Sequence, residues 1–223
     1  SRNTYRPVTH RSCRPAHRSS SEVGVPLAAK DYVKMLRQPT LETPRLVLRP
    51  FRMADADDVQ RLAGDFAIAD TTLNIPHPYE DGLAEKWISN HRDWFLDGEQ
   101  AIFAITLKES AGTLIGAVGL QINPLDERGE LGYWLGKDFW NHGYCTEAAR
   151  VVVEYGFEQM RLHRIQACHF TRNPASGRVL EKIGMVREGL LRGHSKRWEA
   201  FEDIVIYGLV NPDGRAATRP SAG

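Results

Sequence analysis

The chain has 223 residues, of which 42% are hydrophobic and 26% are charged, and this composition suits one packed globular domain. The formal net charge of +1 argues against nucleic acid and acidic membrane surfaces as partners, because proteins that bind them carry a clear basic excess. The three cysteines, Cys13, Cys145 and Cys168, lie far apart without a CxxC pair, which disfavours a disulfide framework and a zinc site. No apolar run approaches the ~20 residues of a membrane-spanning helix, so we expect a cytoplasmic protein.

The first 40 residues have the composition of a flexible extension. Residues 1–20 contain five arginines and no acidic residue, and they hold too few apolar side chains to build a packed core. An organelle transit peptide has a similar composition, but a disordered extension is the simpler interpretation. Residues 22–38 show weak helical character. We expect the folded domain to span residues 41–210 and a flexible tail to follow it over residues 211–223.

Periodicity and turn residues predict the elements of the domain in chain order. Alternating leucine and arginine predict a strand over residues 41–51, and an acidic first turn with a terminal Gly64 predicts a helix over residues 54–64. Apolar residues at helical spacing predict a second helix over residues 83–98. Three strand-like runs separated by short turns then predict an antiparallel meander, over residues 101–109, 112–122 and 129–136. The remaining elements are predicted as a helix (144–160), a strand (163–170), a helix (173–184) and two strands (185–193 and 198–210).

Gly143 stands where the last strand of this meander gives way to the helix over residues 144–160. Such a turn presents unpaired backbone N–H groups at the positive end of the helix dipole, and it binds phosphate without a basic side chain. We therefore expect the amides of residues 142–146, together with the hydroxyl of Thr146, to face a pyrophosphate; a plain turn is the alternative. The stretch lacks the GxGxxG and GK[ST] motifs, which disfavours dinucleotides and nucleoside triphosphates, and His142 alone forms no metal site.

The stretch WNHGYC, residues 140–145, occupies the six positions of the coenzyme A motif of the GCN5-related N-acetyltransferases (GNAT), with Trp140 where the general motif has Gln or Arg. Within this family the chain resembles the Rim-type branch, the ribosomal-protein alanine N-acetyltransferases. The segments that carry the resemblance lie in register over residues 41–210: LETPRLVLRPF, GELGYWLG, W..GY.TEA, HRIQA and N.ASGRVLEKIGM.REG. The resemblance implies an α/β (α+β) GNAT fold: a mixed, mostly antiparallel central sheet of about seven strands, helices on both faces, and the order β-α-α-β-β-β-α-β-α-β-β.

The resemblance also implies acetyl transfer to a primary amine, with acetyl-CoA as co-substrate and no metal. The strand GYWLG is expected to splay from its neighbour, so that its backbone groups pair with pantetheine as an added strand would. Asn173 is expected to donate to the coenzyme arm, with Ser176 nearby; a helix cap is the alternative role for Asn173. The coenzyme A residues that the resemblance implies are Tyr133, Trp134, Leu135, Asn141, His142, Gly143, Tyr144, Cys145, Thr146, Asn173 and Ser176.

Glu130 is the candidate general base, because it begins the strand that would hold the thioester and glutamates in this strand are implicated in related enzymes. The alternative is a solvated glutamate beside Arg128. Many family members have a tyrosine that protonates the leaving thiolate, and Leu180 stands in its place. A thiol pKa near ~8.5 allows the thiolate to leave without that acid. A nucleophilic role for Cys145 is disfavoured, because no base or orienting partner can be named for it.

The residues leave the identity of the amine acceptor open. A polypeptide N-terminus is the first hypothesis by resemblance, and an α-amino group titrates near ~8, so a modest base suffices for it. Small molecules such as aminoglycosides, polyamines and amino acids are alternatives, and a catalytically silent acyl-CoA-binding module is another. Substrate contacts in such folds come from the segments numbered here 71–81, 83–98 and 192–203, with Trp87 and Trp94 as core or pocket wall. Homodimers are common in this branch, so the resemblance leaves a homodimer open.

Overall fold

The computed structural model describes residues 37–110 and 112–213, and eight strands of this part of the chain form one sheet. The order across the sheet is β1-β2-β3-β4-β5-β6-β8-β7. Every neighbouring pair is antiparallel except β5 and β6, which run parallel. The prediction of a mixed, mostly antiparallel sheet is thus confirmed. The strands are β1 (Leu41–Glu42), β2 (Leu46–Pro50), β3 (Gln100–Leu107), β4 (Leu114–Asn123), β5 (Arg128–Leu135), β6 (Arg164–Phe170), β7 (Val186–Arg197) and β8 (Ala200–Val210).

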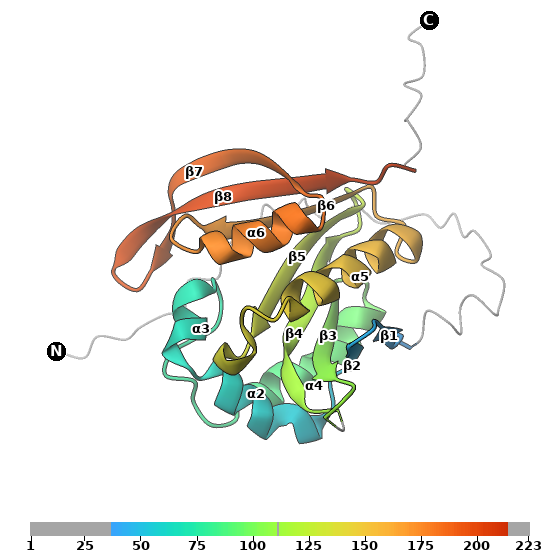
Figure 1. The fold of residues 1–223 in the computed structure, drawn as a ribbon, viewed down its shortest axis with the longest axis vertical. Helices are drawn as coiled ribbons and strands as arrows, with labels where there is room; N and C mark the ends of the chain where they lie inside the picture. Colours follow the sequence, from blue (N-terminus) through green and yellow to red (C-terminus); the bar gives the residue numbers. More distant parts are fainter. Residues whose placement is uncertain (1–36, 111, 214–223) are drawn as a thin grey trace, which may run out of the picture. The chain divides into compact units, whose positions relative to one another are not determined.

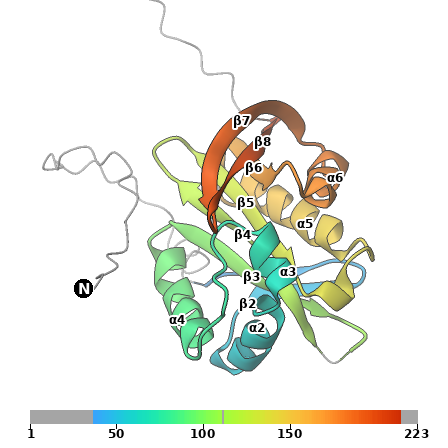
Figure 2. The same ribbon diagram turned by 90° about the vertical axis from the view of Figure 1, so that its left-hand side faces the viewer.

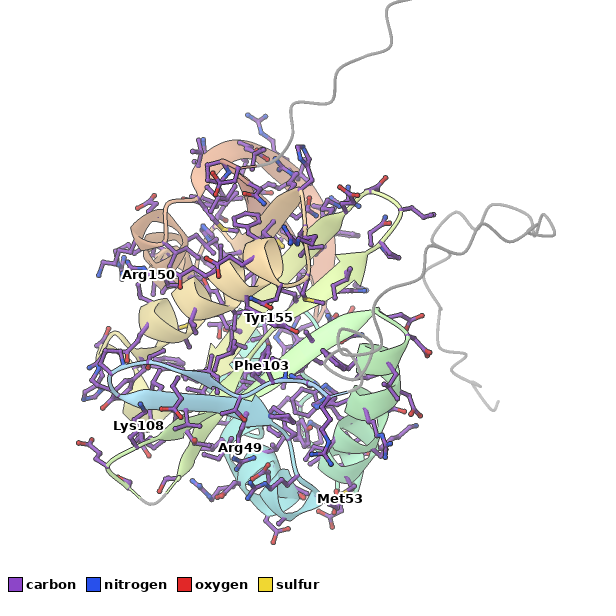
Figure 3. All side chains as sticks on the ribbon, turned by 90° about the vertical axis from the view of Figure 1, so that its right-hand side faces the viewer. Arg49, Met53, Phe103, Lys108, Arg150 and Tyr155 are labelled. Carbon is purple, nitrogen blue, oxygen red and sulfur yellow. The ribbon has the colours of Figure 1, made fainter. Side chains whose placement is uncertain are left out.

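Helices cover both faces of this sheet, as predicted (Figure 1 and Figure 2). On one face α5 packs into the main core, where the ring of Tyr155 meets the ring of Phe103 on β3 edge-on at 5.7 Å between centroids (Figure 3). On the other face α2 and α4 enclose a second, smaller core. The helices are η1 (Met53–Asp55), α2 (Ala56–Ala63), α3 (Phe66–Thr71), α4 (Leu83–Leu96), η2 (Lys137–Phe139), α5 (Tyr144–Glu158) and α6 (Pro174–Lys182).

The strand predicted over residues 41–51 is in fact two short antiparallel strands, β1 and β2. The chain turns back between them at Pro44, whose nitrogen has no hydrogen to donate to a strand ladder. The backbone N–H of Thr43 donates to the carbonyl of Leu46 at 3.0 Å and closes this turn. The sheet therefore has eight strands instead of about seven.

The helix α3 is a second departure from the predicted order of elements. Asp65 caps it by accepting a hydrogen bond from the backbone N–H of Ala67 at 2.8 Å. A helix of six residues is too short to show a helical repeat of apolar side chains, so only the cap could have indicated it.

Predictions for the ends of the chain fall largely outside the described residues. The extension predicted for residues 1–40 overlaps the described part only from residue 37, and the tail predicted for residues 211–223 overlaps it only as far as residue 213. The weak helix over residues 22–38 lies almost wholly outside it. Within the described ranges, none of the helices combines the length and the apolar character that crossing a membrane requires.

The parallel pair β5 and β6 diverges after a short stretch of pairing. Their register runs from Arg128 opposite Arg164 to Glu130 opposite Gln166, and it ends there. Both strands continue beyond this point, β5 to Leu135 and β6 to Phe170. The predicted splay of the strand GYWLG is therefore present, and it leaves one edge of β5 without a strand partner.

Candidate active site

A cleft of about 600 Å³ opens where β5 and β6 diverge. Its walls come from β4, β5, the turn before α5, α6, the first turn of α5, and residues 71–75 at the end of α3 and beyond it. The volume lies within the range of about 300–1,000 Å³ that small-molecule and cofactor sites occupy. Among the predicted site residues, all except His142 line this cleft. The fold thus brings together predicted residues from three separate parts of the sequence, 130–135, 141–146 and 173–176.

The N-terminus of α5 presents free backbone amides to the cleft. Gly143 precedes the helix with φ of 79°, and Asn141 has φ of 65°. Such left-handed conformations suit glycine, and asparagine tolerates them better than most residues. The first helical hydrogen bond runs from the amide of Glu147 to the carbonyl of Gly143 at 3.1 Å, and no side chain of the cap residue satisfies the amides of the first turn. These amides and the helix dipole together form an anion site.

Arg45, on the approach to β2, braces this turn, and the sequence analysis did not identify it. Its guanidinium donates to the carbonyl of His142 at 3.0 Å and to the carboxylate of Glu147 at 2.7 Å. It also lies 4.5 Å from the centroid of the Tyr144 ring, on which the His142 ring stacks. Burial alone would raise the pKa of Glu147, but hydrogen bonds from Thr43 and Arg45 outweigh burial and lower that pKa. Arg45 stands in the quoted segment LETPRLVLRPF, yet nothing local shows that it reaches residue 142.

The register between β4 and β5 decides which backbone groups of β5 face the gap. Gly136 donates to the carbonyl of Ile115 at 2.9 Å, and hydrogen-bonded pairs alternate along an antiparallel ladder. The backbone of Trp134 is therefore directed to Ala117 on β4, whereas Tyr133 and Leu135 direct theirs to the unpaired edge. This corrects the expectation that all three residues offer backbone groups to a ligand. The side chain of Trp134 still lines the cleft.

The contacts of Trp140 give a structural reason for a tryptophan at this position of the coenzyme A motif, where the general motif has Gln or Arg. Its indole Nε1 donates to the carbonyl of Leu135 at 2.8 Å. The indole thereby satisfies the last carbonyl of β5, which no neighbouring strand reaches. The edge left for a ligand consists of the remaining groups of Tyr133 and Leu135.

The first turn of α6 forms the opposite wall of the cleft. The carboxamide oxygen of Asn173 accepts the amide N–H of Ser176 at 3.3 Å, so Asn173 caps the helix, and its amide NH₂ is not needed for that role. The phenol of Tyr133 donates to the carbonyl of Ser176 at 3.1 Å and lies 2.9 Å from its hydroxyl. Burial raises the pKa of Tyr133 above its usual range, so this phenol is protonated and ties β5 to α6.

Two basic residues of α6, Arg178 and Lys182, also line the cleft. They stand four residues apart, so they lie on the same side of the helix. They are not among the residues predicted from the sequence, although their spacing was a readable signal. They add positive charge to the wall that an anionic ligand would meet.

Glu130 lies at the point where the pairing of β5 and β6 ends. Its carboxylate accepts a hydrogen bond from the side-chain amide of Gln166 at 3.2 Å. Arg128, named as the neighbour in the alternative interpretation, is 3.6 Å from Asp126 instead. Within the described part of the chain, Glu130 is the only carboxylate that lines the cleft. Burial, followed by the negative charge of Glu130, raises the pKa of the Cys168 thiol to about 11.

Neither Cys145 nor the residue at the position of the family tyrosine supplies chemistry to the cleft. Burial raises the pKa of Cys145 to about 12, so its thiol stays protonated near neutral pH and is a poor nucleophile. Leu180 is fully buried in the main core. A nucleophilic Cys145 was disfavoured from the sequence alone, and this buried environment agrees with that interpretation.

The end of the cleft nearest α3 is built from side-chain contacts between distant segments. Residues 71–75 line it, and Arg197 at the end of β7 donates to two carbonyls within this segment and to one just before it. These acceptors are the carbonyl of Ala69, the carbonyl of Ile75 at 2.5 Å and the carbonyl of Leu73 at 3.4 Å. Trp87 lines the cleft as a wall residue, as expected of it.

Comparisons with known proteins agree with this geometry. Residues 45–186 match the acetyltransferase (GNAT) domain family. The uncharacterized N-acetyltransferase p20 of Bacillus licheniformis is 32% identical over 77% of this chain and 96% of its own length. The solved structure of the ribosomal-protein-S5-alanine acetyltransferase of Vibrio fischeri has a TM-score of 0.71 and 21% identity, over 79% of this chain and 99% of that one. The microcin C7 self-immunity acetyltransferase MccE, solved with acetyl-CoA and AMP, has a TM-score of 0.68 and 19% identity, over 75% of this chain and 93% of that one. At these identities the two structures support the fold alone.

Proposed function

The chain belongs to the GNAT family of acetyltransferases, and on that premise we propose that it moves the acetyl group of acetyl-CoA to a single primary amine, in the first place the α-amine of a polypeptide N-terminus. The observation that carries this proposal is the unpaired edge of β5 beside the free amides of α5, with Glu130 where the edge begins. A strand-like arm and a pyrophosphate need these two features at neighbouring positions.

The residues of the cleft suit coenzyme A group by group. The amides of Tyr144, Cys145 and Thr146 offer donors to a pyrophosphate. The free backbone groups of Tyr133 and Leu135 suit the amides of a pantetheine arm. A Cβ atom added at Gly132 on β5 would have no heavy atom within 4 Å, so the cleft stays open beside the edge that the arm would follow.

The remaining coenzyme contacts come from α6 and from the turn before α5. The carboxamide NH₂ of Asn173 is available to the coenzyme arm, and the hydroxyl of Ser176 faces the same space. Asn141 lies beside the pyrophosphate position. His142 contributes by shaping the turn, because its carbonyl and its ring are both engaged outside the cleft.

In the reaction, bound acetyl-CoA supplies the acetyl group as a thioester. The carboxylate of Glu130 takes a proton from the acceptor amine, directly or through water. The amine nitrogen bonds to the carbonyl carbon, and the carbon–sulfur bond breaks. Backbone N–H groups at the free edge of β5 donate to the carbonyl oxygen as its negative charge grows. The thiol leaves as the thiolate or with a proton from water, since its pKa is near ~8.5.

The charge of the cleft favours an acceptor with one amine. Glu130 is the only carboxylate that lines it among the described residues, whereas a polyamine or an aminoglycoside carries several ammonium groups that need carboxylate partners. An α-amine with its pKa near ~8 also makes a smaller demand on the base than lysine, with its pKa near ~10.4. The name of the Vibrio fischeri structure, an alanine acetyltransferase of a ribosomal protein, is consistent with this acceptor class.

A thiol-release assay tests the proposal. Acetyl-CoA is combined with N-terminal peptides, a polyamine, an aminoglycoside and free amino acids, and mass spectrometry locates the acetyl group in the product. We expect α-amine acetylation of peptides, and a rise in melting temperature with acetyl-CoA alone. Binding of acetyl-CoA without thiol release from any amine would identify a silent module. Absence of both results would contradict the proposal.

A further inference from the structure

One side of α6 lines the cleft well beyond the first turn of the helix. Ala175, Arg178, Val179 and Lys182 stand at helical spacing, and all four belong to the lining. Such residues share one side of a helix, whereas Leu180 points into the main core. The lining therefore follows α6 for about 10 Å, at a rise of about 1.5 Å per residue.

This side of α6 brings positive charge to the cleft. Within the described part of the chain, Arg178 and Lys182 are the only arginine and lysine side chains in the lining. Neither has an ion-pair or hydrogen-bond partner among those residues, whereas Arg172, just before α6, is held by two carboxylates. Glu181, the acidic neighbour in sequence, accepts a hydrogen bond from the phenol of Tyr207 at 3.0 Å instead. The two cations are therefore available to an anionic ligand.

The charged part of α6 lies close to α5, whose first turn holds the proposed pyrophosphate site. The two helices lie side by side on one face of the sheet (Figure 1). The guanidinium of Arg150 on α5 (Figure 3) donates to the carbonyl of Lys182 at 3.0 Å. Arg150 stands about two turns of helix after Gly143. The free amides of α5 and the two cations of α6 are thus neighbouring anion sites in one cleft.

Coenzyme A carries anionic groups at two neighbouring places. One is the pyrophosphate, and the other is a phosphate on the 3′ oxygen of the adjoining ribose. A phosphate monoester carries a charge of about −1.5 to −2 at neutral pH. Arginine binds such a group through two parallel N–H donors, and lysine binds it as a point charge. The amides of α5 suit the pyrophosphate, so the ribose phosphate still needs a cationic partner.

We propose that Arg178 and Lys182 bind the ribose 3′-phosphate of coenzyme A and thereby select the complete coenzyme as the acetyl donor. The inference rests on the proposed function and adds the residues that decide which donor the enzyme accepts. Acetyl-3′-dephospho-CoA has the same thioester, pantetheine arm and pyrophosphate and lacks only this phosphate. The coenzyme occupies the cleft between α5, β5 and α6, and the end nearest α3 is left for the acceptor.

Variants of α6 and two forms of the donor test this contact together. Arg178→Gln and Lys182→Gln, singly and combined, remove the charges and keep polar side chains with good helix propensity. The combined variant Lys86→Gln and Arg92→Gln is the matched control, because it removes the same charge from exposed positions of α4 outside the lining. Calorimetry at one salt concentration measures the Kd of each protein for acetyl-CoA and for acetyl-3′-dephospho-CoA.

We expect the parent to bind acetyl-CoA about 30-fold more tightly than the form without the phosphate, as two ionic contacts at exposed positions would give. Each single variant should weaken acetyl-CoA binding about fivefold, and the double variant about 30-fold. The Kd for the dephospho form should stay within about twofold of the parent in all of them, a result that a misfolded variant would not produce. The control should keep the parent's preference for acetyl-CoA.

Three results would overturn the inference. The parent binds the two donors equally, or the double variant weakens both by the same factor, or the control on α4 loses as much of the preference as the double variant on α6. If the parent shows the expected preference and acetylates no amine, the proposed function fails and the phosphate contact stands. If the parent binds neither donor, both fail.

Discussion

The half of the cleft that we propose for the acetyl donor and the half that we propose for the acceptor are held together by different kinds of contact. The donor half consists mainly of backbone groups: the first amides of α5 and the free edge of β5. The acceptor half depends on side chains that join distant segments, such as Arg197 to carbonyls up to 128 positions away in sequence. Backbone groups are set by the local conformation of one turn, whereas these side-chain contacts exist only after the whole sheet has formed. The variants below separate the two halves, from the largest expected effect to the smallest.

Gly143→Glu should disable the donor half. A non-glycine residue at φ of 79° costs about 1–2 kcal/mol, and the new carboxylate would stand where a pyrophosphate binds. We expect acetyl-CoA affinity to fall by about 100-fold or more, measured by calorimetry. Gly82→Glu is the matched control, because Gly82 also precedes a helix with φ of 82° but lies outside the lining of the cleft. Equal losses in both variants would show that strain, and not the anion site, causes the effect.

Glu130→Gln should lower kcat without changing the affinity for acetyl-CoA. Glu130 lies where the proposed donor half of the cleft meets the proposed acceptor half. The amide keeps the shape and cannot take a proton, so kcat should fall by about 100-fold, within the usual range for a general base. Acetyl-CoA affinity should stay unchanged. Steady-state kinetics and calorimetry check the two values, with the exposed Glu154 on α5 changed to Gln as the control. A parent-like kcat between pH 6 and 9 would remove Glu130 as the base.

The buried His91 on α4 should make the stability of the folded protein depend on pH. Burial lowers the pKa of His91 to about 4, and neither ring nitrogen has a hydrogen-bond partner among the described residues. An unfolded histidine titrates near 6.5, so the unfolded state binds more protons between these values. Stability is therefore full above pH ~6.5 and falls as pH drops toward 4, by roughly 2 kcal/mol at pH 5.

His91→Phe is expected to remove this loss, because phenylalanine fits the surrounding rings of Phe51, Trp87 and Trp94 and cannot be protonated. Denaturant unfolding at pH 7 and pH 5 measures the difference. The exposed His163, changed to Phe, provides the control and should keep the parent's pH dependence. The same dependence in His91→Phe would show that another group causes it.

Arg45→Met should have the smallest effect, a rise in acetyl-CoA Kd of about fivefold. The guanidinium acts on the donor half through the carbonyl of His142, the carboxylate of Glu147 and the ring of Tyr144. Its side chain is 47% exposed, where single ion pairs contribute about 1 kcal/mol or less. Acceptor KM should not change. A change in acceptor KM equal to that in Kd would mean that the two halves are coupled through this turn.

Much of the fold was predictable because its signals are local. Gly143 and Asn173 mark the starts of α5 and α6, and the structure finds both as caps. The strands and α-helices from residue 83 onward follow the predicted order, since each of them extends over seven or more positions. The two short strands on either side of Pro44 were predicted as one strand, and the six-residue α3 was not predicted. Elements this short show no periodic pattern of apolar residues.

The candidate site, too, has one part that the sequence predicts and another that only the tertiary structure shows. The sequence by itself determined the proposed donor side: a glycine turn before a helix, followed by segments that resemble the GNAT family, predicts the place of coenzyme A. Only the tertiary structure decided that the backbone of Trp134 is used by β4, that Arg45 braces the turn, and that Arg197 holds the wall beside Glu130. Register, ion pairs across a hundred residues and the shape of a cavity depend on how strands align. No local pattern encodes that alignment, because it is the sum of packing over the whole sheet.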